Sequence, residues 1–233
     1  LNRLKVEGLY IADRQNDTLL YAGEVHFRIT DWFIFRKDKP VIKYIGLHNT
    51  YANLYRTGKS DEWNYQFVID GFSSSKKKPS KQEGTAIDID LKEVDLGNVR
   101  FHMNDGWVGS DMNFEVGSFN IDADKIDFKT KEIVIGNIDA VAAKVILRDY
   151  QGGRPPKPKS NQQRVIDTTA FNPGKWDIKV ADLELDDCYF SFDHIKREPF
   201  PGEFDPDHIR IGSINIDVND VHIYADTLTA KLN

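Results

Sequence analysis

Cysteine and long apolar runs are scarce in this sequence, and each scarcity excludes something. The single cysteine among 233 residues, Cys188, rules out an internal disulfide, and we expect it to be a small buried apolar residue. No apolar run approaches the ~18 residues that a membrane-spanning helix needs. The chain also lacks an excess of positive charge: the net charge is −6 and the pI about 5.5. Nucleic acid is therefore not an expected partner.

Sequence motifs of catalysis and metal binding are missing as well. The chain has neither a complete Gly-x-x-x-x-Gly-Lys-Ser/Thr phosphate loop nor a Gly-x-Ser-x-Gly nucleophile elbow. Asp122 and Asp124 alternate with apolar residues, as on the water-facing side of a half-buried sheet, which favours a solvated face over a calcium site. His194, Asp205 and His208 flank a proline-rich loop without zinc-ligand spacing. We expect no enzyme activity, no cofactor and no metal.

One pattern of apolar residues separated by polar ones occurs three times. It is clearest from Glu115 to Phe128 and recurs from Arg210 to Ile223, so that Gly212 follows Gly117 by 95 residues. A more diverged copy begins at Gly23, 94 residues before Gly117. Three ungapped copies indicate a repeated structural unit.

A second block precedes each copy, with the spacing apolar-x-apolar-x-x-apolar-x-apolar. Its members are Leu4, Val6, Leu9 and Ile11; then Ile89, Leu91, Val94 and Leu96; and then Ile178, Val180, Leu183 and Leu185. In the first copy, the four apolar residues share one face of a strand only if a β-bulge at Gly8 absorbs the extra residue. Two short strands around a bend would give the same string.

The repeats predict an all-β fold: an elongated, curved antiparallel sheet with one short helix. A unit of about 90 residues is longer than common solenoid repeats, so each unit holds several strands, about five to seven. The three units, about 1–84, 85–175 and 176–233, form a single elongated domain. The first residue is not Met, and we expect the chain to be a fragment of a larger protein. The polar segments Ser73–Gly84 and Gln151–Gln163 are predicted loops.

A helix is predicted over Asp61–Phe72. Trp63, Phe67 and Val68 have helical spacing there, behind Ser60 and Asp61 as capping residues. We expect this helix to cover one end of an apolar surface.

The apolar face has two interpretations. A curled sheet makes an open trough that binds an apolar client, whereas two sheets packed face to face fill the space with side chains. Periodicity does not separate the two. The residues predicted to line the trough are Leu4, Val6, Leu9, Ile11, Val25, Phe27, Ile29, Ile89, Leu91, Val94, Leu96, Phe119, Ile121, Ile178, Val180, Leu183, Leu185, Ile214 and Ile216.

The stretch from Leu4 to Ile29 resembles the N-terminal part of TamB proteins, especially those of Bacteroidetes. It reads Leu-Lys-Val-Glu-Gly-Leu-Tyr-Ile-Ala-Asp, then Asp-Thr-Leu-Leu-Tyr-Ala-Gly and His-Phe-Arg-Ile. The resemblance continues through Gly117-Ser-Phe-Asn-Ile and covers nearly the whole chain. TamB belongs with the AsmA-like proteins, which are similar in architecture to bridge-like lipid-transfer proteins.

This resemblance implies a repeating β-groove in the periplasm, attached to the bacterial inner membrane through a segment outside this chain. Its implied partners are phospholipid acyl chains that move toward the outer membrane. The alternative is an assembly factor that binds outer-membrane β-barrel proteins or a barrel-assembly component. Both roles are non-enzymatic.

Overall fold

The computed structural model describes residues 3–29, 41–73, 88–127, 130–155, 172 and 174–232. Within them lie ten strands and one helix. The elements are β1 (Arg3–Ala12), β2 (Thr18–Ile29), β3 (Val41–Arg56), α2 (Gln66–Ser73), β4 (Asp88–Asp105), β5 (Ser110–Asp127), β6 (Glu132–Val141), β7 (Lys144–Asp149), β8 (Asp177–His194), β9 (His208–Tyr224) and β10 (Thr227–Leu232).

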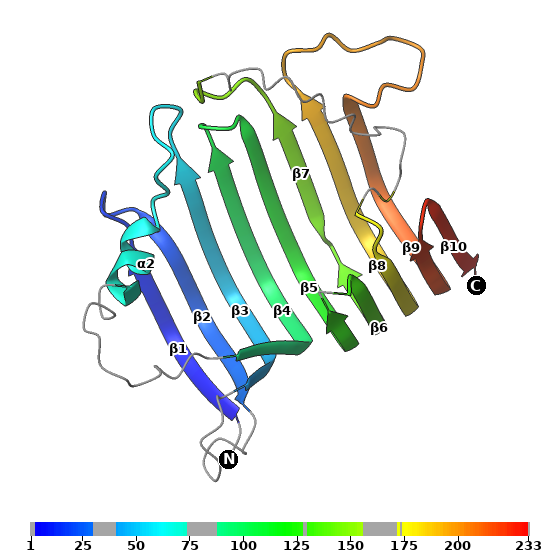
Figure 1. Cartoon of the computed structure of the whole chain (residues 1–233), viewed down its shortest axis with the longest axis horizontal. Helices are drawn as coiled ribbons and strands as arrows, with labels where there is room; N and C mark the ends of the chain where they lie inside the picture. The colour runs from blue at the N-terminus through cyan, green and yellow to red at the C-terminus, as the bar shows by residue number, and fades with distance from the viewer. Residues whose placement is uncertain are drawn as a thin grey trace.

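All ten strands form one sheet, in the order β1-β2-β3-β4-β5-β6-β8-β9-β10 (Figure 1). β7 occupies the same position as β6, because it pairs with both β5 and β8 beyond the point where β6 ends. The prediction of an all-β fold with a curved sheet and one short helix is confirmed, and the sheet is mostly rather than wholly antiparallel. No helix in the described part of the chain is long and apolar enough to cross a membrane.

Strand direction follows a rule that the sequence pattern did not reveal. Neighbouring strands are antiparallel except at two places, where β3 pairs with β4 and where β6 and β7 pair with β8 in parallel. A parallel pair needs a crossover connection, so long segments separate β3 from β4 and β7 from β8. The predicted loops fall in these crossovers, and residues 74–87 and 156–171 lie outside the described part of the chain.

Between the parallel junctions the chain runs through only three sheet positions, not the five to seven strands expected for each 90-residue unit. The reason is strand length. β4, β5 and β8 each have 18 residues, about three times the usual ~6. Ninety residues are therefore used by three long strands and one crossover.

A line of unusual backbone positions crosses every long strand at the same level, and we call it the seam. Six of its members have φ between 48° and 65°, the left-handed region that L-residues seldom adopt. The strand pairing places the members from Gly8 to Asp187 side by side across the sheet, and Ser213 lies next to this line, where the register between β8 and β9 shifts. The seam consists of Gly8, Gly23, Asn49, Asn98, Gly117, Ala142, Asp187 and Ser213.

The seam corrects the interpretation of Gly8 as a β-bulge. A bulge places two residues of one strand opposite one of its partner. Here Glu7 still pairs with Glu24 and Leu9 with Ala22, so Gly8 and Gly23 lie opposite each other without a change of register. Both strands slip by one residue together, which keeps their apolar residues on one face on both sides of the seam.

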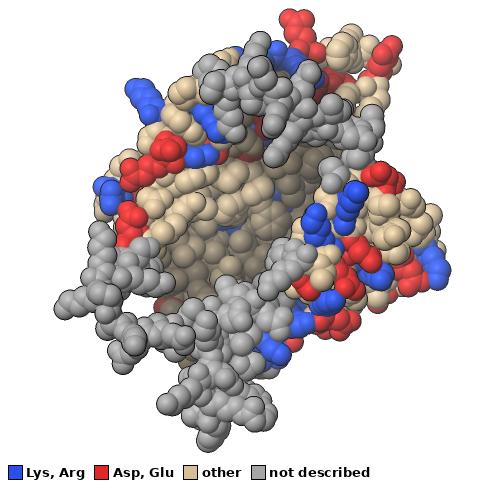
Figure 2. Space-filling view, in the orientation of Figure 1, with Lys and Arg blue, Asp and Glu red and all other residues tan. Residues whose placement is uncertain are grey.

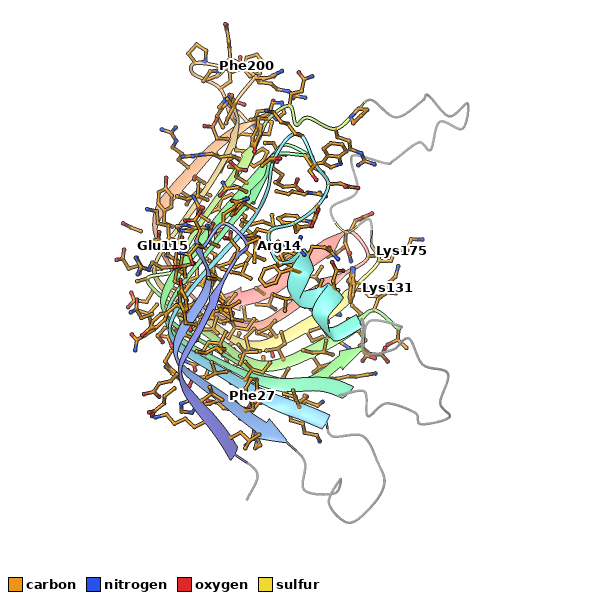
Figure 3. The ribbon with its side chains drawn as sticks, turned by 90° about the vertical axis from the view of Figure 1, so that its left-hand side faces the viewer. Arg14, Phe27, Glu115, Lys131, Lys175 and Phe200 are labelled. Atoms are coloured by element: carbon orange, nitrogen blue, oxygen red, sulfur yellow. The ribbon has the colours of Figure 1, made fainter. Side chains whose placement is uncertain are left out.

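The long strands bend near their middle, so that the sheet folds into a gutter running across them (Figure 3). α2 lies on the open side of the bend at the β1 end of the sheet (Figures 1 and 3). The helix begins at Gln66, later than predicted. The Ser60 hydroxyl accepts the Glu62 N–H at 3.1 Å within the preceding turn, so it does not cap α2.

The sheet is one layer thick. The accessible surface of the whole chain is 16954 Å², whereas a compact monomer of this mass exposes about 10,700 Å². No large side chain in the described residues is completely buried. The main buried cluster comprises residues of β5, β6, β8 and β9 on the same face: Ala123, Ile135, Val180, Val218 and Val221. The described residues form no second sheet, so the closed sandwich is not built.

Candidate functional site: an apolar groove

Apolar side chains form continuous rows that cross the sheet at right angles to the strands. Residues paired directly across neighbouring strands point to the same face, so the register traces each row. The Leu4 row runs through Leu4, Phe27, Ile45, Val94, Ile121, Ile138, Leu183, Val218 and Leu232. The Val6 row runs through Val6, Val25, Leu47, Leu96, Phe119, Ala140, Leu185 and Ile216.

Two more rows lie beyond the seam. The Leu9 row contains Leu9, Ala22, Thr50, Val99 and Val116, and farther along Cys188 and Ile214. The Ile11 row contains Ile11, Leu20, Ala52, Phe101, Phe114, Val145, Phe190 and Ile211. Most members of the Leu9 row are small, including the buried Cys188. The groove therefore has a narrow strip of small side chains along its bend and larger ones on its walls.

The predicted lining residues fall on this one face wherever their side chains are described. Ile178 and Val180 extend it on the other side of the Leu4 row, where they pair with Ile133 and Ile135. The side chains of Ile29, Ile89 and Leu91 lie outside those that the structure describes.

The register corrects two sequence alignments. Leu4 lies in a row with Val94 instead of Ile89, so the second block was matched five residues too early. Phe119 lies in a row with Ile216, whereas Ile214 is one row farther on, across the seam.

The sequence predicted strands over Val41–Tyr55 and Ile133–Leu147, but their apolar residues were left out of the predicted lining. Ile45 and Leu47 on β3, and Ile138 and Ala140 on β6, complete the rows but were not predicted to line the trough. The alternation from Ile133 to Ala140 was the available signal.

The opposite face is polar. One row there runs through Lys5, His26, Gly46, Asp95, Asn120, Asp139, Glu184 and Asp217. The exposed Asp122 lies on this face, as its alternation predicted. Glu115 points away from the open side of the bend in Figure 3. The polar face is therefore the outer, convex one.

The concave face is hollowed and almost without charge, and charged side chains gather around its border (Figure 2). Exposure rises toward both edges of the sheet: Val25 is 4% exposed, but Leu4 on β1 is 56% and Leu232 on β10 is 85% exposed. The apolar rows thus continue to both open edges.

Buried carboxylates order the loops at one rim of the groove. Asp13 accepts hydrogen bonds from the Tyr55 hydroxyl at 2.9 Å and from the backbone N–H groups of Gln15 and Asp17. Burial by itself raises the pKa of Asp13, but these hydrogen bonds outweigh it and the pKa is lowered. Burial, and then the same contact with Asp13, raise the pKa of Tyr55 to about 12.

The β4–β5 turn has an equivalent carboxylate. Asp105 accepts two hydrogen bonds from Arg56, at 2.7 Å from Nε and 2.6 Å from Nη2, and a third from the Val108 N–H. The Arg56 guanidinium lowers the pKa of Asp105. Arg56 also lies over the Trp63 ring, 4.7 Å from its centroid, which ties the segment before α2 to this rim.

Of the His and Asp residues noticed around the β8–β9 loop in the sequence, Asp205 and His208 contact each other through their side chains. His208 lies between Asp205, at 2.8 Å from Nδ1, and Asp193, at 3.4 Å from Nε2. Asp205 also accepts hydrogen bonds from the backbone N–H groups of Phe200 and Asp207. The hydrogen bond from Phe200 lowers the pKa of Asp205 most. The cluster fastens the β8–β9 loop. Within the described residues, no group of three or more His, Cys, Asp or Glu could hold a metal.

No protein-family model, curated protein or solved structure matches the chain.

Proposed function

We propose that this chain is a segment of a non-enzymatic lipid bridge, whose concave groove holds phospholipid acyl chains as they pass from the inner to the outer membrane of a bacterial envelope. Its place is the periplasm, attached to the inner membrane through a segment outside this chain. The continuous apolar rows carry this proposal, together with the TamB resemblance of the sequence.

The dimensions of the groove support an acyl-chain occupant. Nine sheet positions at ~4.8 Å give a groove about 38 Å long. One leaflet contributes about half of the ~30 Å hydrocarbon core of a bilayer, so an acyl chain fits lengthwise. The four rows that cross the sheet cover on the order of 750 Å², more than the largest apolar patch of a typical monomer, at about 300–600 Å².

Bound lipid is the direct test. Native mass spectrometry and lipid extraction of protein purified without detergent should find phospholipid in about stoichiometric amount. Protein that is folded and free of lipid after expression in a bacterial envelope would contradict the proposal.

Charged substitutions in the apolar rows test lipid binding by the groove separately from folding. In the Val6 row, Ile216 is 38% exposed, so Ile216→Asp should leave a folded protein. It should nonetheless abolish lipid retention, because a carboxylate in the groove opposes acyl-chain contact. Ser118→Asp, on the convex face, is the matched control and should retain lipid. Equal lipid retention by both variants would count against the groove.

Strand edges favour a second candidate, an assembly factor for outer-membrane β-barrel proteins. β1 is an edge strand, and β10 covers β9 only from Val218 to Tyr224, so the described residues leave the other half of β9 unpaired on that side. An extended client strand could add to either edge. Capture of an unfolded barrel peptide by lipid-free protein, with no lipid retained in the groove, would favour this candidate.

A further inference from the structure

The β8–β9 loop, residues 195–207, exposes three large apolar side chains at the tip of the molecule. Ile195 is 56%, Phe200 62% and Phe204 81% exposed. The loop projects beyond the ends of the strands, and Phe200 lies at its extremity (Figures 1 and 3). These residues lie outside the groove rows, so lipid held in the groove would leave them uncovered.

The loop is fastened at its base, although its tip is exposed. Asp205 is 9% exposed and accepts the Phe200 N–H at 3.0 Å, the Asp207 N–H at 2.9 Å and the His208 ring. The Arg197 guanidinium pairs with Asp207 at 2.6 Å. A loop held in this way loses little conformational entropy when its tip meets a partner.

The backbone of the tip suits an apolar environment. Pro199 and Pro201 have no N–H, and the N–H of Phe200 between them is already donated to Asp205. Three successive residues thus present no free N–H donor, and an unsatisfied donor is what makes entry into hydrocarbon costly. A protein partner would need a pocket for this convex tip, whereas hydrocarbon adapts to its shape.

We propose that the β8–β9 loop inserts Phe200 and Phe204 into the interfacial region of a phospholipid bilayer and so places one rim of the groove against a membrane. The loop carries two basic and four acidic side chains, a net charge of −2. It is therefore suited to zwitterionic lipid and is repelled by a strongly anionic surface. The proposal does not depend on what the groove holds.

Vesicle flotation provides the test. The protein should float with vesicles of phosphatidylethanolamine and phosphatidylcholine, and less well when phosphatidylglycerol is added at low salt. F200S/F204S should bind the zwitterionic vesicles about a hundredfold more weakly or worse, since the burial of two phenyl side chains in the bilayer is lost. Tyr10→Ser is the matched control, because it removes an aromatic side chain of similar exposure from the convex face.

Depth is measured with Phe204→Trp. The tryptophan fluorescence of this variant should exceed that of the parent protein. Lipids brominated on the acyl chain should quench the added fluorescence. The melting temperature and the amount of lipid bound in the groove should stay unchanged. Equal flotation of F200S/F204S and the parent, or no quenching of the fluorescence that Phe204→Trp adds, would overturn the proposal. The exposed Phe200 and Phe204 would then be assigned to contact with a protein partner instead of a bilayer.

Discussion

At the scale of single residues, the rim of the groove depends on carboxylates that accept backbone N–H groups. Asp13 and Asp205 lie in the β1–β2 and β8–β9 connections, and Asp105 is the last residue of β4, beside the β4–β5 turn that is the equivalent connection of its unit. Each is buried, and each has a lowered pKa. Their ionised forms are therefore part of the folded structure at neutral pH.

The lowered pKa of Asp105 predicts a loss of stability in acid. A carboxyl whose folded-state pKa is depressed stabilises the protein above its unfolded-state pKa, which is near 3.8, and loses this contribution as the pH falls through the folded-state value. Asp105→Asn should cost about 3 kcal/mol at pH 7, because Arg56 is left with a neutral partner.

Thermal melts from pH 7 to pH 2 measure this effect. The difference between wild type and Asp105→Asn should shrink below pH 4. Asp122→Asn, at an exposed convex position, is the control and should change the melting temperature little. A difference that stays constant down to pH 2 would show that the charge of Asp105 does not stabilise the turn.

A seam residue gives a second prediction at this scale. Asn98 has φ 51°, and its side chain donates to Asn49 Oδ1 at 2.9 Å in the neighbouring strand. Asn98→Val places a β-branched residue in the left-handed region and should cost about 2 kcal/mol, whereas Asn98→Gly should be close to neutral. Asn113→Val, at a regular position of β5, is the control. Urea unfolding that ranks the Val and Gly variants equally would contradict the role given to the seam.

At the scale of elements, alternation along a strand was readable from sequence, and the relation between strands was not. Leu4, Val6, Leu9 and Ile11 were correctly assigned to one face of β1, because their spacing allows few other arrangements. The slip at Gly8 was read as a local bulge, since one strand does not reveal that its neighbour slips at Gly23. The parallel pairing of β3 with β4, and of β6 and β7 with β8, was not predicted for a similar reason, because it depends on which strands pair after a long crossover.

The helix illustrates how tertiary contacts set an element boundary. Trp63 has helical spacing to Phe67, but its ring lies under Arg56 and its carbonyl accepts the Gln66 N–H. Asn64 is held to β3, since its side chain donates to the Asn53 carbonyl at 3.0 Å and accepts the Tyr55 N–H at 3.0 Å. These contacts hold the segment in a turn, and helix begins only afterwards.

This arrangement predicts that Asn64 fixes α2 on the groove. A helix of eight residues is marginal without tertiary support. Asn64→Ala removes these two hydrogen bonds and a longer one to Asp13, at 3.4 Å, and should speed amide exchange in α2 roughly tenfold. Gln66→Ala, which removes only a side-chain contact to Asp70, is the control. Unchanged exchange in Asn64→Ala would mean that α2 is held by other contacts.

At the scale of the whole molecule, a single curved layer has a shape different from that of a globule of equal mass. A compact chain of 233 residues has a radius of gyration of ~17 Å. The three-strand units lie side by side along the groove, and one face of the sheet stays open, so mass is displaced from the centre. Small-angle scattering of the monomer should give a radius of gyration clearly above 17 Å and an asymmetric pair-distance distribution.

The measurement must be made on lipid-bound protein and on delipidated protein. An open groove should keep its radius when lipid is removed, because strand pairing and not the lipid holds the bend. A fall to ~17 Å after delipidation would show that the empty sheet closes on itself, and the groove would then exist only around its occupant.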